Sequence, residues 1–113
     1  MIFSIHSKNL ELTKPIKGYA EEKIGSVLRL LSGGKSDIPV QIRMEVGKPS
    51  RHHKSGKVFY AEVNLKIGSK LIRSSEEDYD LYVAIDKVRD RLEAQIRKFK
   101  EKRISVHSRE TEK

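Results

Sequence analysis

The chain has no cysteine and no tryptophan among its 113 residues. The absence of cysteine excludes disulfides, thiolate zinc sites and thiol catalysis, so the fold must rest on its hydrophobic core. No apolar run approaches the roughly eighteen residues of a membrane span, and Met1 to Lys8 lack the long apolar stretch of a signal peptide. We therefore expect a cytoplasmic protein with no membrane partner.

Acidic residues are outnumbered, because the chain has 24 Lys and Arg against 16 Asp and Glu and a formal net charge of +8. With a pI near 9.8, the protein favours an anionic partner such as nucleic acid, although acidic lipid would satisfy the same charge. The length fits one domain with a single core. Charged residues make up 35% of the chain, so almost all of them must lie on the surface, where they can meet a polyanion.

Enzyme motifs are also missing. The sequence contains no Gly-rich phosphate loop, no Gly-x-Ser-x-Gly elbow and no His-Glu-x-x-His. Asp78, Asp80 and Asp86 could be imagined as catalytic carboxylates, but acids in a first helical turn are more often capping and dipole partners. His52 and His53 have no Cys and no acid close by in sequence, which argues against a metal site. We expect no catalytic residue, metal, cofactor or small-molecule substrate.

The spacing of apolar residues predicts the element order β-α-β-β-β-α. Alternation of apolar and polar residues is typical of strands with one wet face, and recurrence every three or four residues is typical of amphipathic helices. Thr13 is the expected N-cap of the first helix, and Gly68 with Ser69 the expected hairpin turn. The expected elements are strand 1–7, helix 14–31, strand 38–46, strand 58–67, strand 70–75 and helix 78–103.

This order predicts an α+β fold in which two helices cover one face of a four-stranded, mostly antiparallel sheet and the other face stays open. The helices bury apolar stripes, and the stripe of the second helix consists of Leu81, Ile85, Val88, Leu92, Ile96 and Phe99. Residues 1–103 form the expected domain. Residues 104–113 are polar and are expected to be a flexible tail.

The last helix is polarised along its axis. Residues 76–86 contain five acids and no base, whereas residues 87–103 contain eight bases and three acids. On a helical wheel, four cations fall within an arc of about 60° beside the apolar stripe, namely Lys87, Arg91, Lys98 and Lys102. The helix's own acids gather on the far side around Arg97, so we expect them not to neutralise this row. Such a row suits RNA phosphates, although an ordinary solvated helix face carrying dipole-complementing charges is the alternative.

A second basic cluster lies in the connection between the second and third strands, at residues 48–57. Its composition is typical of a loop, and Arg51 and Lys54 are its candidate RNA-binding residues. Basic loops reach RNA grooves that a flat sheet cannot enter, but they also occur merely for solubility. Both interpretations stay open.

Three segments resemble the ribosome hibernation promoting factor family. Residues 75–86 read Ser-Glu-Glu-Asp-Tyr-Asp-Leu-Tyr-Val-Ala-Ile-Asp, residues 91–100 read Arg-Leu-Glu-Ala-Gln-Ile-Arg-Lys-Phe-Lys, and residues 8–13 read Lys-Asn-Leu-Glu-Leu-Thr. The family has an acidic approach, a Met-Tyr-x-Ala-Ile-Asp start and a basic helix ending in alternating lysines. Leu81 stands where the family usually has Met, which conserves volume. The resemblance covers roughly residues 2–103.

The resemblance implies the same β-α-β-β-β-α fold, similar in outline to double-stranded RNA-binding domains, and binding in the cleft between head and body of the small ribosomal subunit. Binding there would exclude messenger and transfer RNA and inhibit translation under stress or in stationary phase. The family's RNA-facing basic residues fall on Lys23, Arg91, Lys98, Lys100 and Lys102. We expect a ribosome-associated protein that is monomeric when isolated, with the small subunit and its ribosomal RNA as partners.

The combined set of candidate RNA-binding residues is Lys23, Lys87, Arg91, Lys98, Lys100, Lys102, Arg51 and Lys54. A general double-stranded RNA-binding protein or chaperone is the alternative, and it would bind free duplex RNA almost as well as ribosomes. A domain that meets an acidic protein is a further alternative.

Overall fold

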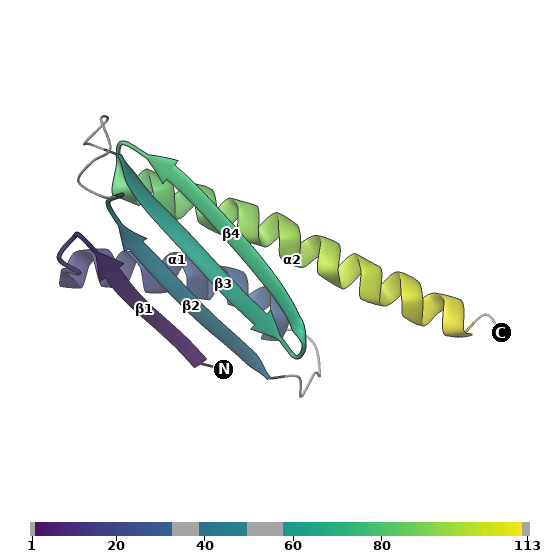
Figure 1. Ribbon diagram of the computed structural model, residues 1–113. Coiled ribbons are helices and arrows are strands. Elements are labelled where there is room, and N and C mark those ends of the chain that lie inside the picture. The colour runs from purple at the N-terminus through teal and green to yellow at the C-terminus, as the bar shows by residue number, and fades with distance from the viewer. Residues whose placement is uncertain (1, 33–38, 50–57, 112–113) are drawn as a thin grey trace.

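The fold of the chain is a four-stranded sheet with two helices on one face. The structure, a computed structural model, describes residues 2–32, 39–49 and 58–111. The elements follow in the order β1 (Ile2–Lys8), α1 (Lys14–Ser32), β2 (Val40–Gly47), β3 (Phe59–Ile67), β4 (Lys70–Asp78) and α2 (Leu81–Thr111). Both helices lie behind the sheet in Figure 1, so the other face of the sheet is open. The predicted element order and α+β architecture are confirmed.

The sheet is mixed, with the strands in the order β1-β2-β3-β4. β1 runs parallel to β2, and β2, β3 and β4 are antiparallel neighbours. A parallel pair needs a crossover connection, which α1 supplies between β1 and β2. Gly68, at a φ of 59°, begins the two-residue turn between β3 and β4, as expected for a hairpin that needs positive φ at its first position. β1 and β4 are therefore the two edges.

The start of each helix is set by a side-chain cap. Thr13 caps α1 as predicted, since its Oγ1 accepts a hydrogen bond from the Ile16 amide at 3.4 Å. α2 begins at Leu81, three residues later than predicted, because the capping acid is Asp80, whose Oδ1 accepts from the Tyr82 amide at 2.9 Å. Asp78 instead ends β4, paired with Phe59 in the register.

α2 continues to Thr111, eight residues beyond the predicted end at residue 103. Glycine and proline, the residues that most often end helices, are absent from residues 69–113, so the sequence has no strong stop signal there. In Figure 1 the end of α2 projects past the sheet toward the C-terminus. The division into a domain at 1–103 and a flexible tail at 104–113 stays a prediction.

The core lies between the sheet and the two helices. Its fully buried members on α2 include Ile85, Val88 and Leu92, which belong to the predicted apolar stripe. Ile42, Val63 and Leu65 supply the sheet's contribution, with the other members of the cluster being Ala20, Ile24, Val27, Leu28, Met44, Val46, Ala61, Ile67, Ile72, Leu81, Ala84 and Ile96. Phe99 packs against this cluster partly buried. The stripe fixes the rotation of α2 and therefore which of its cations face each neighbour.

The end of β1 is held tightly against the end of β2. Gly47 pairs with Lys8 in the parallel register, and a Cβ added at Gly47 would collide with the Lys8 carbonyl oxygen. That oxygen accepts a hydrogen bond from the Lys48 amide at 3.1 Å, and Asn9, at a φ of 56°, donates its Nδ2 to the Lys48 carbonyl at 3.2 Å. Only glycine at position 47 allows this close approach of the two strand ends.

Candidate nucleic-acid interface

The buried stripe of α2 separates two charged sides of the helix. On one side, side chains of α2 reach β4: the Gln95 Nε2 donates to the Arg73 carbonyl at 3.2 Å. On the other side, side chains of α2 reach α1: the Arg89 Nε donates to the Ser26 Oγ at 3.4 Å. The predicted basic residues divide between these sides.

Lys87, Arg91 and Lys98 lie on the β4 side and form the described part of the predicted row. All three side chains are exposed. Lys98 follows Lys87 by eleven positions, which corresponds to about 16 Å along the helix axis at 1.5 Å per residue. We call these three residues the α2 row. The backbone of Lys102 continues α2 beyond it, but its side chain lies outside the described side chains, and Arg51 and Lys54 lie outside the described residues.

Within the described residues the acids of α2 itself do not pair with the row, but acids of β4 do, so the prediction of a row of unpaired cations was wrong for Lys87 and Arg91. The Lys87 Nζ lies 2.8 Å from the Asp78 Oδ2, and the Arg91 guanidinium lies 3.4 Å from the Glu76 Oε1. The hydrogen bond between Lys87 and Asp78 lowers the pKa of the Asp78 carboxyl and raises the pKa of Lys87. Both acids come from β4, which the helical wheel of α2 could not include.

These pairs are solvated, so they leave the cations available. The side chain of Lys87 is 49% exposed and that of Arg91 is 57% exposed. Water and salt screen such pairs strongly, and an incoming phosphate can replace the carboxylate. Lys98 has no acidic partner within the described part of the chain. The α2 row therefore contains one free cation and two held in exchangeable pairs.

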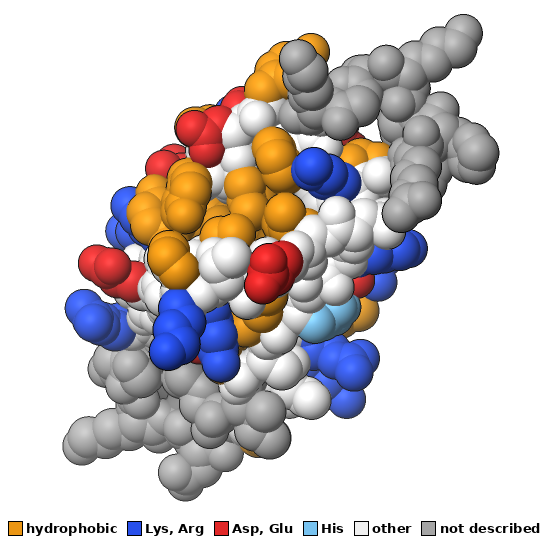
Figure 2. All heavy atoms as spheres, turned by 90° about the vertical axis from the view of Figure 1, so that its left-hand side faces the viewer, with side chains coloured by type: hydrophobic (Ala, Val, Ile, Leu, Met, Phe, Trp, Pro, Cys, Tyr) orange, Lys and Arg blue, Asp and Glu red, His pale blue; other side chains and the backbone are white. Residues whose placement is uncertain are grey.

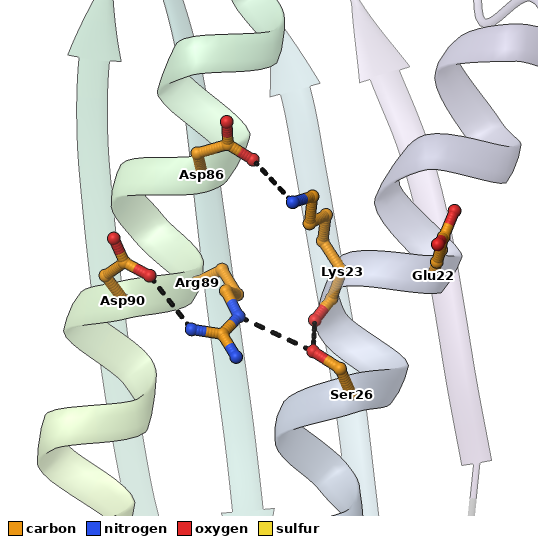
Figure 3. Close-up of a pocket in the computed structure, with 6 residues that line it drawn as sticks. All are labelled: Glu22, Lys23, Ser26, Asp86, Arg89 and Asp90. Carbon is orange, nitrogen blue, oxygen red and sulfur yellow. Dashed lines mark hydrogen bonds and ion pairs between the residues drawn. The ribbon is translucent and has the colours of Figure 1, made fainter.

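The α1 side of α2 borders a groove of about 390 Å³ between the two helices (Figure 3). The groove is lined by three carboxylates, two cations and one hydroxyl, belonging to Glu22, Asp86, Asp90, Lys23, Arg89 and Ser26. Acids outnumber bases here, and the Arg89 guanidinium is already held by Asp90 at 2.9 Å. This charge balance does not suit a phosphate group.

Lys23 and Lys100, which were predicted from the family resemblance, both lie on this α1 side. The Lys23 Nζ is 3.6 Å from the Asp86 carboxylate and 5.4 Å from the centre of the Tyr19 ring. The Tyr19 hydroxyl donates to the same carboxylate at 2.6 Å, and this hydrogen bond raises the pKa of Tyr19 to about 12. The Lys100 Nζ donates to the Leu30 carbonyl at 2.9 Å. The structure therefore does not bring these two lysines together with the α2 row.

A cluster on the open sheet face was not predicted. The Glu45 carboxylate lies 2.8 Å from the His6 ring and accepts a hydrogen bond from the Tyr60 hydroxyl at 2.7 Å. The bond from Tyr60 lowers the pKa of Glu45, while burial and then this carboxylate raise the pKa of Tyr60. The alternation in each strand placed Tyr60 on this face, but only the register brings all three residues together.

A cluster of exposed hydrophobic side chains lies at the end of the domain at which α2 begins. Figure 2 shows hydrophobic side chains gathered at the centre of this view, with acidic side chains along the upper-left margin. Tyr79, Tyr82 and Val83 are exposed there, and the Tyr82 ring meets the Tyr19 ring edge-on with centroids 4.8 Å apart. Lys and Arg side chains also lie on this face, below and beside the hydrophobic cluster (Figure 2).

The described residues show neither a metal-binding cluster nor a membrane-spanning helix. Among their side chains no group of three or more His, Cys, Asp or Glu is placed to hold a metal ion. In the same part of the chain no helix is long and apolar enough to cross a membrane.

The sequence is similar to ribosome-associated proteins. Residues 3–104 match the family described as Sigma 54 modulation protein / S30EA ribosomal protein. The chain is 34% identical over 108 residues to the ribosome hibernation promotion factor of Staphylococcus aureus strain COL, covering 96% of this chain and 52% of that protein. It is 32% identical over 99 residues to the protein of the same name from Deinococcus radiodurans, covering 88% and 49%. The chain thus spans about half the length of these curated relatives.

Solved structures are similar as well. The N-terminal domain of Protein Y from Thermus thermophilus matches with a TM-score of 0.66 and 33% identity, covering 87% of this chain and 94% of that one. A ribosomal subunit interface protein from Coxiella burnetii matches with a TM-score of 0.73, covering 88% and 98%, and at 17% identity it supports the fold alone. The predicted family resemblance is confirmed.

Proposed function

Because the chain belongs to the Sigma 54 modulation protein / S30EA ribosomal protein family, we propose that it is a ribosome hibernation factor. In this proposal the domain binds the small ribosomal subunit through its ribosomal RNA and inhibits translation by occupying a site. Two curated relatives carry the name ribosome hibernation promotion factor. It acts as a binding protein, needs no nucleotide or metal, and works in the cytoplasm on ribosomes.

The observation that carries the proposal is the α2 row. Its cations follow one side of a straight helix, and about 16 Å is long enough to meet several phosphates of an RNA backbone. Binding of this kind releases counterions, so affinity comes from the number of phosphates neutralised rather than from base contacts. The two carboxylates of β4 pair with Lys87 and Arg91 in the free protein, and RNA phosphates replace them on binding.

The proposed binding site is the cleft between head and body of the small subunit, across the messenger and transfer RNA sites. A domain bound there excludes both RNAs by its volume, so inhibition follows from occupancy without a chemical step. The proposed setting is stress or stationary phase, when translation is held inactive. The proposed interface comprises Lys23, Lys87, Arg91, Lys98, Lys100, Lys102, Arg51 and Lys54, with the α2 row as its centre.

Cosedimentation with purified small subunits tests the proposal. The variant Arg91→Glu with Lys98→Glu should lose binding, because it reverses two charges of the α2 row on exposed side chains. The control is Lys14→Glu with Lys17→Glu, which makes the same change in net charge on exposed residues of α1 and should bind like the wild type. Normal binding by the first variant, with its fold intact by circular dichroism, would contradict the proposed interface.

Two further measurements separate the alternatives. Free duplex RNA should compete poorly with small subunits, and equal competition would favour a general double-stranded RNA-binding protein instead. In a purified translation system, inhibition should be stoichiometric with ribosomes and relieved by excess messenger and initiator transfer RNA. Inhibition far below one protein per ribosome would mean that the protein is a catalyst, and the occupancy mechanism would be wrong.

A further inference from the structure

The open face of the sheet carries its charges in two separate halves. The register aligns residues of the four strands in cross-strand rows. Near the hairpin between β3 and β4, two adjacent rows contain three cations and no acid, and their members are Ile2, Gln41, Lys66 and Leu71, then Ser4, Arg43, Asn64 and Arg73. The next two rows contain three acids, and their members are His6, Glu45, Glu62 and Ser75, then Lys8, Gly47, Tyr60 and Glu77. We call the first pair of rows the basic half.

The cations of the basic half are available to a ligand. Arg43, Lys66 and Arg73 are all exposed, and within the described residues neither Arg43 nor Lys66 has an acidic partner. Arg73 is held through its Nε, which donates to the Asn64 Oδ1 at 2.8 Å and lies 3.8 Å from Glu62. That arrangement leaves the two terminal nitrogens of the guanidinium for another acceptor.

The spacing of these cations suits an extended polyanion. Arg43 on β2 and Arg73 on β4 are two strands apart, or about 10 Å, because neighbouring strands lie about 4.8 Å apart. Lys66 lies on the strand between them in the adjacent row. The three cations are thus distributed across three strands and two adjacent rows, an arrangement that offers separate contacts to the successive phosphates of an RNA strand.

The basic half is continuous with the α2 row around the β4 edge. The Arg73 carbonyl accepts from Gln95, and the Ser75 carbonyl accepts from Arg91 at 3.5 Å. Gln95 lies between Arg91 and Lys98 along α2, so Arg73 reaches the open face at the level of the α2 row. The two surfaces meet at one edge strand, with helix cations on one side and sheet cations on the other.

We propose that the basic half of the open sheet face, Arg43, Lys66 and Arg73, is a second RNA phosphate-binding surface, and that RNA contacts the domain on both sides of the β4 edge. This inference rests on the proposed function, since the RNA is that of the small subunit. An RNA partner is favoured over an acidic protein or a lipid surface because the same edge continues into the α2 row.

The test compares the variant Arg43→Gln with Lys66→Gln against the control Lys8→Gln with Arg97→Gln. Both variants lose two exposed positive charges, but Lys8 lies in the acidic half and Arg97 is held by Glu93 at 2.9 Å. Small-subunit affinity is measured from 0.1 to 1 M monovalent salt at constant magnesium. In a plot of log affinity against log salt concentration, the slope of the first variant should be smaller than that of the wild type by about 1.8, because each lost phosphate contact removes about 0.9. If variant and wild type bind equally at 1 M salt, this difference makes the variant bind about 60-fold more weakly at 0.1 M. The control should keep the wild-type slope.

A second measurement needs no variant. In the complex with small subunits, Lys66 should be protected from an amine-reactive reagent, while Lys8 on the same face should stay reactive. An unprotected Lys66, or a wild-type salt slope for the variant Arg43→Gln with Lys66→Gln, would overturn the inference and leave the proposed function standing. Failure of the wild type to bind small subunits would overturn the proposed function itself.

The other partner classes give different results. If the first variant loses binding to vesicles containing anionic lipid while its small-subunit affinity is unchanged, the basic half is a lipid surface and the RNA assignment is wrong. Retained binding of ribosome complexes after RNase treatment, lost in the same variant, would identify an acidic protein as its partner. If the first variant loses small-subunit affinity and its affinity also depends less steeply on salt, the partner of the basic half is RNA.

Discussion

Removing the Asp78 carboxylate should tighten RNA binding, which is the opposite of what most interface substitutions do. Asp78 holds Lys87 at 2.8 Å, so a phosphate must displace a carboxylate before it can pair with this lysine. The substitution Asp78→Asn removes the negative charge but keeps an amide oxygen. That oxygen can still accept the hydrogen bond that the Asp80 amide donates at 3.0 Å. The turn between β4 and α2 should therefore persist.

The size of the effect follows from counting charges. In the variant, Lys87 is free in the unbound protein and behaves like Lys98, so binding neutralises up to one more phosphate. The slope of log affinity against log salt concentration should steepen by up to about 0.9. This change corresponds to about eightfold tighter binding at 0.1 M salt if variant and wild type bind equally at 1 M. The Lys87 pKa, now raised by Asp78, should move back toward its ordinary value.

The assay is the salt titration of small-subunit binding, with Asp90→Asn as the control. Asp90 also pairs with an arginine, Arg89 at 2.9 Å, but on the α1 side of α2, so its loss makes the same charge change away from the α2 row. Only Asp78→Asn should steepen the slope. Weaker binding, or equal tightening by both variants, would refute the view that the β4 acids compete locally with phosphate.

Four further predictions concern the fold. Leu92→Ala should lower the free energy of unfolding by about 2 to 5 kcal/mol in urea titrations, because Leu92 is fully buried between helix and sheet; a change under about half a kcal/mol would mean that the site collapses without a cavity. Gly47→Ala should lower the free energy of unfolding by about 1 to 3 kcal/mol, because the added methyl group would push β1 away from β2; an unchanged melting temperature would contradict the close contact between Gly47 and the Lys8 carbonyl. Ser74→Ala should raise the free energy of unfolding by about 1 kcal/mol, because the buried Ser74 hydroxyl has no hydrogen-bond partner among the described residues; a lower free energy of unfolding would mean that the hydroxyl has a partner. The lowered pKa of Glu45 gives stability that is present above pH 4.5 and lost as the pH falls through the lower folded value. Tyr60→Phe should shrink this acid-dependent loss, and an identical pH profile would exclude the Tyr60 hydrogen bond as its source.

The parts of the fold that sequence predicted well are those set by local periodicity. Alternation along β3 and the stripe through Leu92 are consequences of strand and helix geometry, and tertiary packing only reinforces them. The boundary between β4 and α2 was wrong because Asp78 and Asp80 are both plausible caps. Pairing with Phe59, 19 residues earlier, keeps Asp78 in the sheet, and no local pattern contains that information.

In the candidate site, too, only the features set by local periodicity could be predicted from the sequence. The rotation of α2 was predictable, and with it the alignment of Lys87, Arg91 and Lys98. The neutralisation of the first two was not, because Glu76 and Asp78 face them from another element. A helical wheel shows how the charges of one helix are arranged around its axis, and it does not include acids that a neighbouring strand brings close to the helix.

The positions assigned from the family resemblance were likewise predicted only in part. A resemblance identifies corresponding residues, but it does not say which side chains of this protein contact them. Lys23 and Lys100 were placed in one set with the α2 row, yet each is engaged on the α1 side, with Asp86 and with the Leu30 carbonyl. Engagement alone does not remove a residue from an interface. In the proposed interface, these two lysines would exchange their protein partners for RNA on the α1 side of α2, away from the α2 row.

The β4 edge connects the architecture to the proposed interface. An edge strand exposes unpaired backbone carbonyls and amides that can recruit another strand, so proteins usually cover or charge such edges. Here α2 covers the edge from one side, because Arg91 and Gln95 donate to the carbonyls of Ser75 and Arg73. Of these two shielding side chains, Arg91 also brings positive charge to the edge. A strand of another protein would have to displace them, whereas an RNA backbone, which needs no backbone pairing, could follow the same edge and be held by cations on both of its sides.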